Sequence, residues 1–209
     1  MAYYPIFVEL GGRRCVVIGG GTVAARKVEG LLAVDAVVHV VSPTLTSALT
    51  ALVASGRITH EARNYQLGDL AGAALAFSAL ADPAIGTTIA AEARERGVWL
   101  NAADDPARCS FILPAVLRRG VLTVGVASGG ATPALTRLLR DHLETVLGPE
   151  WAALGDIAVD ARRELRAAGR MADGERWRRA LGADVRALLA DGRHEEARRL
   201  LRECLEKPA

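Results

Sequence analysis

Cysteine is scarce in this sequence of 209 residues, whose three cysteines lie far apart at Cys15, Cys109 and Cys204. Their number is odd, and no two of them form a C-x-x-C pair. This distribution argues against a disulfide framework and against a structural zinc site. It is typical of proteins in a reducing cytoplasm, where we expect this chain to lie.

Long hydrophobic runs and a large excess of one charge are also absent. No stretch approaches the roughly 18 uninterrupted apolar residues of a membrane span, and residues 1–10 lack the pattern of a signal peptide. Lys and Arg total 26 and Asp and Glu total 24, so the net charge is only +2. We therefore expect neither a membrane nor a nucleic acid as a partner.

What the sequence does contain is a glycine-rich turn between a strand pattern and a helix pattern. Residues 15–18 (CVVI) predict a buried parallel strand, and residues 23–32 have helical periodicity. The turn between them fits G-x-G-x-x-A, a dinucleotide fingerprint, and comprises Gly19, Gly20, Gly21, Thr22, Val23 and Ala24. Gly19 permits the tight turn, and Gly21 lets the backbone approach a pyrophosphate that the helix N-terminus attracts. The alternative is a glycine turn that binds nothing.

The second predicted strand, residues 36–41, ends without the acidic residue that usually binds the adenosine ribose. Ser42 and Pro43 stand there instead, so the choice between NAD and NADP stays open at this point. Ser42 could bond either a ribose hydroxyl or a phosphate. His39, inside the strand, is interpreted as a structural residue.

The remaining patterns of residues 1–109 predict a Rossmann-like, doubly wound parallel sheet of the α/β class. Further strands are expected at residues 5–10, 57–61, 74–80 and 98–101, and a helix at 86–96 with Thr87 as its N-cap and Gly97 after its end. Asp104 and Asp105 follow the last strand, so we expect them to face the cofactor crevice. The alternative is an aspartate pair in a surface loop.

Residues 110–150 predict a small α+β segment that follows the sheet. Two strands, 110–117 and 121–127, flank a basic turn, and a helix begins at Thr132 and Pro133. Before that helix, Ser128, Gly129 and Gly130 form a turn suited to an anion, because free N–H groups point outward there. Carboxylates could be held by nearby arginines, which otherwise are solvated surface residues: Arg108, Arg118, Arg119, Arg137 and Arg140.

Five segments taken in order resemble the precorrin-2 dehydrogenase family, which includes the N-terminal module of siroheme synthase. The resemblance covers about residues 3–150, and its segments are PIFVEL, VVIGGGTVAARK, NAADDP, SFILPA and VASGGATPALTRLLRDHLE. It implies NAD-dependent dehydrogenation of precorrin-2 to sirohydrochlorin in siroheme biosynthesis, with or without ferrous iron insertion to give siroheme. It also implies a homodimer, in which the partner completes the cleft.

The resemblance assigns roles to particular residues. Asp104 matches the family's key aspartate, implicated in dehydrogenation and in chelation, and a transient metal at Asp104 is compatible with that role. Ser128, Gly129, Gly130, Arg108 and Arg137 are the expected contacts of the tetrapyrrole. The expected cofactor contacts are Gly19, Gly20, Gly21, Thr22, Val23, Ser42, Pro43 and Ala79. Many relatives have Ala-Thr-Asp where this chain has Ala79, Leu80 and Ala81, so a hydroxyl near the nicotinamide is missing.

Residues 151–209 predict a helical C-terminal region, with helices at 151–168, 175–189 and 195–205. His142 and His194 are isolated, so we expect no stably bound structural metal. Two other functions stay open: an oxidoreductase for another polycarboxylate, and a non-catalytic NAD-binding sensor. A sensor would need an output surface such as a basic recognition helix, which is not evident in the sequence.

Overall fold

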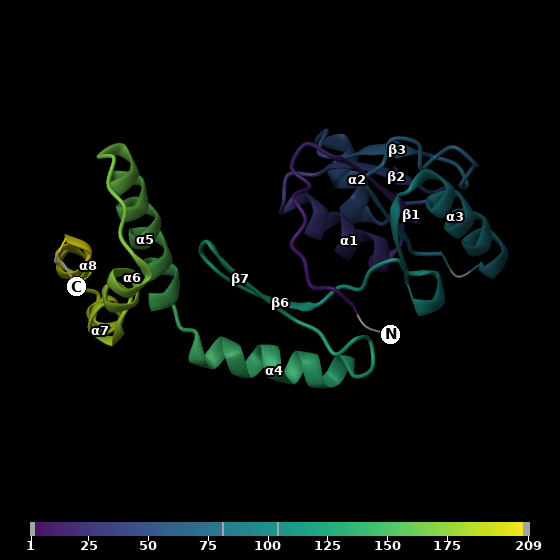
Figure 1. Ribbon diagram of the computed structural model, residues 1–209. Helices are drawn as coiled ribbons and strands as arrows, with labels where there is room; N and C mark the ends of the chain where they lie inside the picture. The colour runs from purple at the N-terminus through teal and green to yellow at the C-terminus, as the bar shows by residue number, and fades with distance from the viewer. Residues whose placement is uncertain (1–2, 81, 104, 207–209) are drawn as a thin grey trace. The chain divides into compact units, whose positions relative to one another are not determined.

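The computed structural model describes residues 3–80, 82–103 and 105–206. Its chain divides into two compact units, residues 1–112 and 113–209 (Figure 1). The predicted division into residues 1–109, 110–150 and 151–209 stays a prediction; the boundary between the two units falls after residue 112.

The first unit is built on a five-stranded parallel sheet, which confirms the predicted fold class. The strand order is β3-β2-β1-β4-β5, so β1 lies between β2 and β4. Ile18, the last residue of β1, is in register with Val41 of β2 and Ser78 of β4. The strands are β1 (Arg14–Ile18), β2 (Val37–Val41), β3 (Thr59–Glu61), β4 (Leu75–Ser78) and β5 (Trp99–Ala102).

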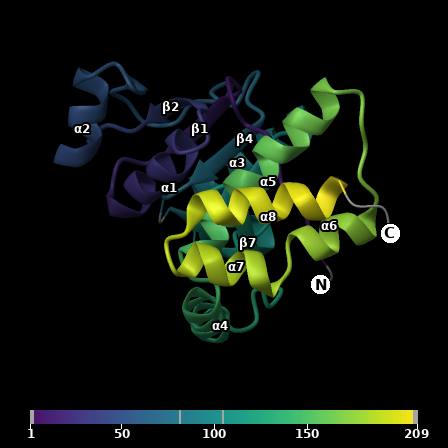
Figure 2. The same cartoon turned by 90° about the vertical axis from the view of Figure 1, so that its left-hand side faces the viewer.

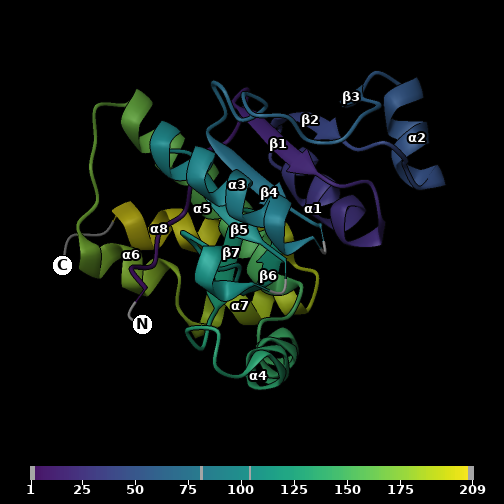
Figure 3. The same ribbon diagram turned by 90° about the vertical axis from the view of Figure 1, so that its right-hand side faces the viewer.

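Helices cover both faces of this sheet. On one face α1 (Thr22–Leu32) and α2 (Ser47–Ala54) pack against alternate strand residues, with Val17, Val28 and Leu49 fully buried. On the other face lies α3 (Pro83–Arg96), which runs along β4 (Figure 3). Its Ile89 belongs to the same buried cluster as Val16. Burial on both faces explains why the central strands are continuous apolar runs. A short 3-10 helix, η1 (Pro106–Arg108), follows β5.

Two local expectations for this unit are wrong, and one helix was missed. Residues 5–10 form no strand; they pair with neither edge of the sheet, and the Phe7 side chain is 78% exposed. The helix expected at 86–96 begins at Pro83, because the Asp82 carboxylate rather than Thr87 accepts the N–H groups of its first turn. The helix α2 was not predicted; the Thr46 hydroxyl caps its N-terminus.

The second unit begins with an antiparallel hairpin, β6 (Ala115–Arg119) and β7 (Leu122–Val126). The helix α4 (Pro133–Val146) packs along it, in agreement with the start predicted at Thr132 and Pro133. Four further helices have a core of their own that includes Leu154, Val185 and Leu201 (Figure 2). They are α5 (Glu150–Ala167), α6 (Gly174–Ala180), α7 (Ala183–Ala190) and α8 (His194–Glu206).

The single helix expected at 175–189 is divided in two at Gly182. This residue has extended backbone angles and is the N-cap of α7, while α6 ends at Ala180. A Cβ at Gly182 would lie 2.9 Å from the carbonyl oxygen of Arg179, so the chain needs glycine at this sharp change of direction. The first strand of the hairpin is also shorter than expected, starting at Ala115 rather than at residue 110.

Candidate functional site

The glycine-rich turn lies at the point where the direction of strand order reverses. Gly19 follows β1 and Ala79 follows β4, and the Ala79 N–H donates to the Ile18 carbonyl at 2.8 Å. Gly19 has φ of +114°, and a Cβ on it would lie 2.9 Å from the Ala79 carbonyl oxygen. Both the backbone angle and the close contact therefore require glycine. In open parallel sheets, this switch point is where ligands bind.

The β2–α2 loop packs directly against the same turn. The Thr46 N–H donates to the Gly20 carbonyl at 2.9 Å, and the Thr44 carbonyl lies where a Gly20 side chain would be. Ser42 is buried, and its hydroxyl donates to the Thr44 carbonyl at 2.7 Å. The Ser42 hydroxyl therefore donates its one hydrogen bond within the loop. Pro43, the next residue, is exposed. The Ser42 hydroxyl oxygen lies 2.8 Å from where a Gly20 Cβ would be, so Ser42 is beside the glycine turn, and contact of Ser42 and Pro43 with the cofactor stays a prediction.

The N-terminus of α1 has the free donors that a pyrophosphate needs. Gly21 is the N-cap, no side chain caps the helix there, and no atom lies within 4 Å of where its Cβ would be. Thr22 is exposed and Val23 half-buried at the start of the helix, while Ala24 is fully buried against the sheet. The uncapped N–H groups and the open space at Gly21 fit the diphosphate of a dinucleotide.

Asp104, the predicted catalytic residue and transient metal ligand, lies outside the described residues, as does Ala81. Its neighbour Ala103 donates its N–H to the Ser78 carbonyl at 2.8 Å, which holds the segment after β5 against the end of β4. Asp105 forms an ion pair of 2.6 Å with Arg108, which also donates to the Thr87 hydroxyl. Arg108, expected to contact the substrate, thus anchors this segment to α3.

In the second unit, the predicted anion turn precedes α4. Gly129 and Gly130 have φ of +64° and +85°, so both need the freedom of glycine. The Ser128 hydroxyl accepts the Thr132 N–H at 3.0 Å and so satisfies one donor at the helix start. Arg137 projects from the exposed surface of α4 and has no ion-pair partner among the described residues.

Two other arginines of this segment, Arg119 and Arg140, bond to residues of α4 or its end. Arg119 donates to the carbonyls of Leu147 and Glu144 and so caps the C-terminal end of α4. Arg140 pairs with Asp141 at 2.7 Å and more weakly with Glu144. These two guanidinium groups are therefore not free to hold a substrate carboxylate without first giving up a partner.

The sequence analysis did not identify one buried carboxylate, which belongs to the helix α3. Glu92 of α3 has a fully buried side chain and accepts from Arg96 at 2.6 Å, from the Gly68 N–H at 3.0 Å and from the Tyr65 hydroxyl. The pKa of the Tyr65 hydroxyl is raised above its usual range, first by burial and second by the hydrogen bond to Glu92. The sequence feature that could have indicated the burial of Glu92 is its position about one helical turn after Ile89, a buried residue of the same helix.

Two histidines lie beside β2 and β3. The ring of His60 bonds the Ser42 carbonyl through Nε2 at 2.8 Å, so this nitrogen carries a proton. His39 meets the Thr59 hydroxyl at 2.6 Å, which agrees with the structural role expected for it. Burial, followed by the charge of Arg14, lowers the pKa of His39.

Within residues 3–80, 82–103 and 105–206, no three His, Cys, Asp or Glu side chains gather where they could hold a metal ion. Over the same ranges, no helix has the length and apolar character needed to cross a membrane.

Comparisons with known proteins agree with the fold and with the glycine turn. Residues 6–115 match a sequence family described as "Putative NAD(P)-binding". The chain is 36% identical to a siroheme synthase of Nitrosomonas europaea over 99% of its own length and 44% of that protein. It is 38% identical to the siroheme synthase of Azotobacter vinelandii, covering 96% of this chain and again 44% of the relative. The chain therefore spans less than half the length of these relatives.

A solved structure has the same fold over nearly the whole chain. It is that of SirC, precorrin-2 dehydrogenase, with a TM-score of 0.73, 22% sequence identity and coverage of 98% of both chains. At this identity the match establishes the fold. Together the comparisons confirm the resemblance seen in the five sequence segments and extend it to residues 151–209.

Proposed function

The chain belongs to this NAD(P)-binding family, and from that premise we propose that it catalyses the NAD-dependent dehydrogenation of precorrin-2 to sirohydrochlorin in siroheme biosynthesis. One observation carries the proposal: the dinucleotide cradle at the switch point belongs to a chain that resembles siroheme synthases over almost its whole length. The proposed enzyme is an oxidoreductase of the cytoplasm.

The residues around the turn favour NAD over NADP. The Ser42 hydroxyl donates its hydrogen bond to the Thr44 carbonyl, so toward a ligand its oxygen can only accept. A ribose hydroxyl can donate to such an oxygen, whereas a 2′-phosphate has only acceptors. No Arg or Lys occurs at residues 42–46 to neutralise a 2′-phosphate. Gly19, Gly20 and Gly21 with the start of α1 would hold the diphosphate, and Ala79 would flank the nicotinamide end.

The chemistry is divided between cofactor and protein. When bound, NAD accepts a hydride from the substrate. Asp104 would receive the proton that leaves the macrocycle at the same time, since a carboxylate at the edge of the crevice can act as a general base. We propose that the same carboxylate receives pyrrole protons as ferrous iron enters sirohydrochlorin, with iron as a substrate. Ser128, Gly129, Gly130 and Arg137 would bind the carboxylates of the tetrapyrrole.

The proposed assembly is a homodimer formed through the second unit. Every residue of α4 is at least partly exposed, although the helix carries a continuous apolar stripe. The exposed members of that stripe are Leu135, Leu138, Leu139 and Val146. A stripe of this kind, on a helix whose main neighbours among the described elements are the two strands of a hairpin, is typical of a surface covered by another copy.

An anaerobic absorbance assay with enzymatically made precorrin-2 tests the reaction. We expect the sirohydrochlorin spectrum to appear only after NAD is added, and siroheme to form faster than the protein-free rate after ferrous iron follows. No NAD-dependent change would contradict the dehydrogenase and favour the sensor or another polycarboxylate substrate. Iron insertion at the protein-free rate would contradict the chelatase alone.

Two variants in this assay separate the adjacent aspartates. Asp104→Ala should lower the turnover by about 100-fold, the range of general acid–base catalysis, with NAD affinity unchanged. Asp105→Asn removes the charge paired with Arg108 and should reduce turnover only a few-fold, about the effect of a weakened surface ion pair. Wild-type turnover in Asp104→Ala would remove this carboxylate from the mechanism.

A further inference from the structure

The second unit contains a groove lined by none of the residues assigned to the proposed reaction. It lies between the tip of the β6–β7 hairpin, the helix α5 and the helix α6, and has a volume of about 550 Å³. This volume is in the range of sites for small organic ligands. All of its lining residues belong to the second unit, so the groove is complete within that unit.

Two glycines hold the hairpin tip against α5. A Cβ at Gly155 would lie 2.7 Å from a methyl carbon of Val121, and one at Gly120 would lie 3.2 Å from the Ala152 Cβ. Gly120 also has φ of +53°, which the turn of the hairpin requires. These close approaches fix one wall of the groove relative to its floor.

The surface of the groove is largely apolar. Leu122 of the hairpin and Val159 of α5 are exposed toward solvent, and the indole of Trp177 is only half-buried. Met171, between α5 and α6, is 90% exposed although its side chain is apolar and adaptable. An aromatic ring and a flexible thioether beside an open apolar floor suit a planar apolar molecule.

The rim of the groove is positive. Arg162 and Arg166 are one helical turn apart on α5, Arg170 follows the end of that helix, and no Asp or Glu is among the lining residues. Within the described part of the chain, Arg162 and Arg166 have no carboxylate partner within ion-pair distance. Successive guanidinium groups on one face are separated by about 6 Å along the axis, which lets each bind a different carboxylate.

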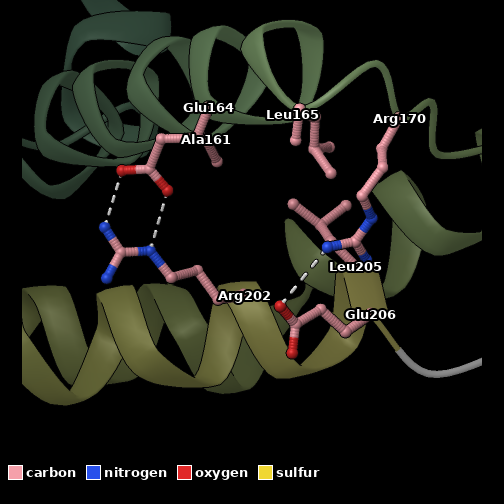
Figure 4. Close-up of a pocket in the computed structure, with 8 residues that line it drawn as sticks. Ala161, Glu164, Leu165, Arg170, Arg202, Leu205 and Glu206 are labelled. Carbon is pink, nitrogen blue, oxygen red and sulfur yellow. Dashed lines mark hydrogen bonds and ion pairs between the residues drawn. The ribbon is translucent and has the colours of Figure 1, made fainter.

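A second cavity nearby shows the opposite arrangement. It lies between α5 and α8, and its charges are neutralised within the protein (Figure 4). Glu164 and Arg202 form a two-bond pair with a shortest distance of 2.7 Å, and Arg170 approaches Glu206 at 3.7 Å. Arg170 lines both cavities and is paired with Glu206, so the unpaired charges of the hairpin groove are those of Arg162 and Arg166.

We propose that the hairpin groove binds a planar apolar molecule that carries two or more carboxylates. Its apolar body would cover Leu122, Val159 and Trp177, and its carboxylates would pair with Arg162 and Arg166. This site goes beyond the proposed reaction, because it includes neither the glycine turn nor Asp104. Its test therefore does not depend on the roles proposed for them.

Binding of coproporphyrin III, a planar tetracarboxylate, to the full chain tests the site. Fluorescence anisotropy of the porphyrin would be measured without NAD and without precorrin-2, so failure of the proposed dehydrogenation leaves the result readable. We expect saturable binding that weakens with added salt, and little binding of a tetracationic porphyrin of similar size. Failure of the wild-type chain to bind coproporphyrin III would overturn the proposal.

Matched variants locate the binding. The double variant Arg162→Gln/Arg166→Gln should weaken binding at least about tenfold, and Val159→Glu should do the same by placing a carboxylate in the groove. Arg163→Gln/Arg199→Gln removes the same charge from solvent-facing positions and should change the affinity less than about twofold. Equal losses in the two double variants would show general charge attraction and overturn the proposal.

Two further outcomes would also overturn it. In the first, Ser128→Asp abolishes porphyrin binding while the groove variants do not, which places the ligand at the turn before α4. In the second, Val159→Glu changes the oligomeric state in sedimentation while leaving porphyrin binding intact, which makes the groove a contact between copies. Unchanged sedimentation together with the loss of binding supports the site.

Discussion

The two units of this chain differ in how completely they bury their own apolar residues. In the first, helices cover both faces of the sheet, and strand residues such as Val16 and Val17 are fully buried on opposite faces. In the second, α5 to α8 have a core, but α4 has no buried residue. The first unit therefore buries its own apolar faces, whereas the apolar stripe of α4 stays exposed within the second unit, as the proposed homodimer requires.

The largest expected effect tests whether the first unit, which buries its own apolar residues, also binds a dinucleotide. Gly21→Asp should lower NAD affinity at least about 100-fold, or about 2.7 kcal/mol, because a carboxylate would stand where the pyrophosphate binds. The same aspartate is a favourable N-cap, so the unfolding temperature should stay equal or rise. Titration calorimetry and thermal unfolding would measure the two quantities.

Gly30→Asp is the control for that variant. Gly30 lies in the same helix, and no atom is within 4 Å of where its Cβ would be. We expect NAD affinity to be unchanged there and the stability of the helix to change little, because aspartate is a better helix former than glycine but stands near the negative C-terminal end of α1. Normal NAD binding by Gly21→Asp would contradict the assignment of the glycine turn.

The next effect tests Glu92 as a polar anchor, meaning a buried acceptor that holds several donors within the mostly apolar core of the first unit. Glu92→Ala leaves the donors of Tyr65, Gly68 and Arg96 without their acceptor and should cost about 3–5 kcal/mol of the free energy of unfolding. Denaturant titration measures the loss. Glu95→Ala, on the exposed side of α3, should change it by less than about 0.5 kcal/mol. Equal effects would mean that Glu92 is not such an anchor.

A third variant tests whether α4 needs a partner. Leu138 is 67% exposed, and Leu138→Glu should raise the dissociation constant of the proposed dimer at least about tenfold by placing a charge in an apolar interface. Sedimentation velocity at several concentrations measures this. Leu67→Glu, at a comparably exposed position of the first unit, should leave the association unchanged. If both chains sediment as the wild type does, α4 is not the interface.

The smallest effect concerns the pH dependence of the first unit. Hydrogen bonds from Arg63 lower the pKa of Asp69 below its ordinary value of 3.8, so the unfolded state takes up a proton more readily than the folded state. The resulting stabilisation is present above about pH 4 and is lost as the pH falls through the folded pKa. Because the pair is partly solvated, it is worth under about 1 kcal/mol.

Asp69→Asn tests that pH dependence. It should flatten the fall in stability below about pH 4 in acid unfolding, since the ionisable group is gone. Asp35→Asn, at a turn residue with φ of +55° that asparagine tolerates, is the control and should retain the wild-type slope. An unchanged slope in Asp69→Asn would assign the acid sensitivity to other carboxylates.

The strands and the glycine turn were predictable because their causes are local. Apolar runs such as residues 15–18 predict strands whatever surrounds them, and a glycine at Gly19 or Gly97 follows from a turn or helix end close by. The strand expected at residues 5–10 failed because a strand needs a neighbour in a ladder, which no local pattern supplies. The break at Gly182 likewise depended on a contact that the helical periodicity of residues 175–189 does not show.

The roles of individual polar side chains were less predictable. Arg108 and Arg119 were both candidates for carboxylate binding, but one bonds Asp105 and Thr87 and the other caps α4. Arginine has several donors on a long side chain, so its partner depends on which acceptors the fold brings within reach.

The sequence by itself determined the class of fold, the place of the dinucleotide turn and the resemblance to the precorrin-2 dehydrogenase family, since each rests on short segments read in order. Only the tertiary structure decided that Glu92 is a buried acceptor, that the Ser42 hydroxyl is used within its loop, and that Arg162 and Arg166 border an apolar groove. The physical reason is that burial and hydrogen-bond partners are set by residues distant along the chain. Glu92, for example, meets Tyr65 across 27 positions.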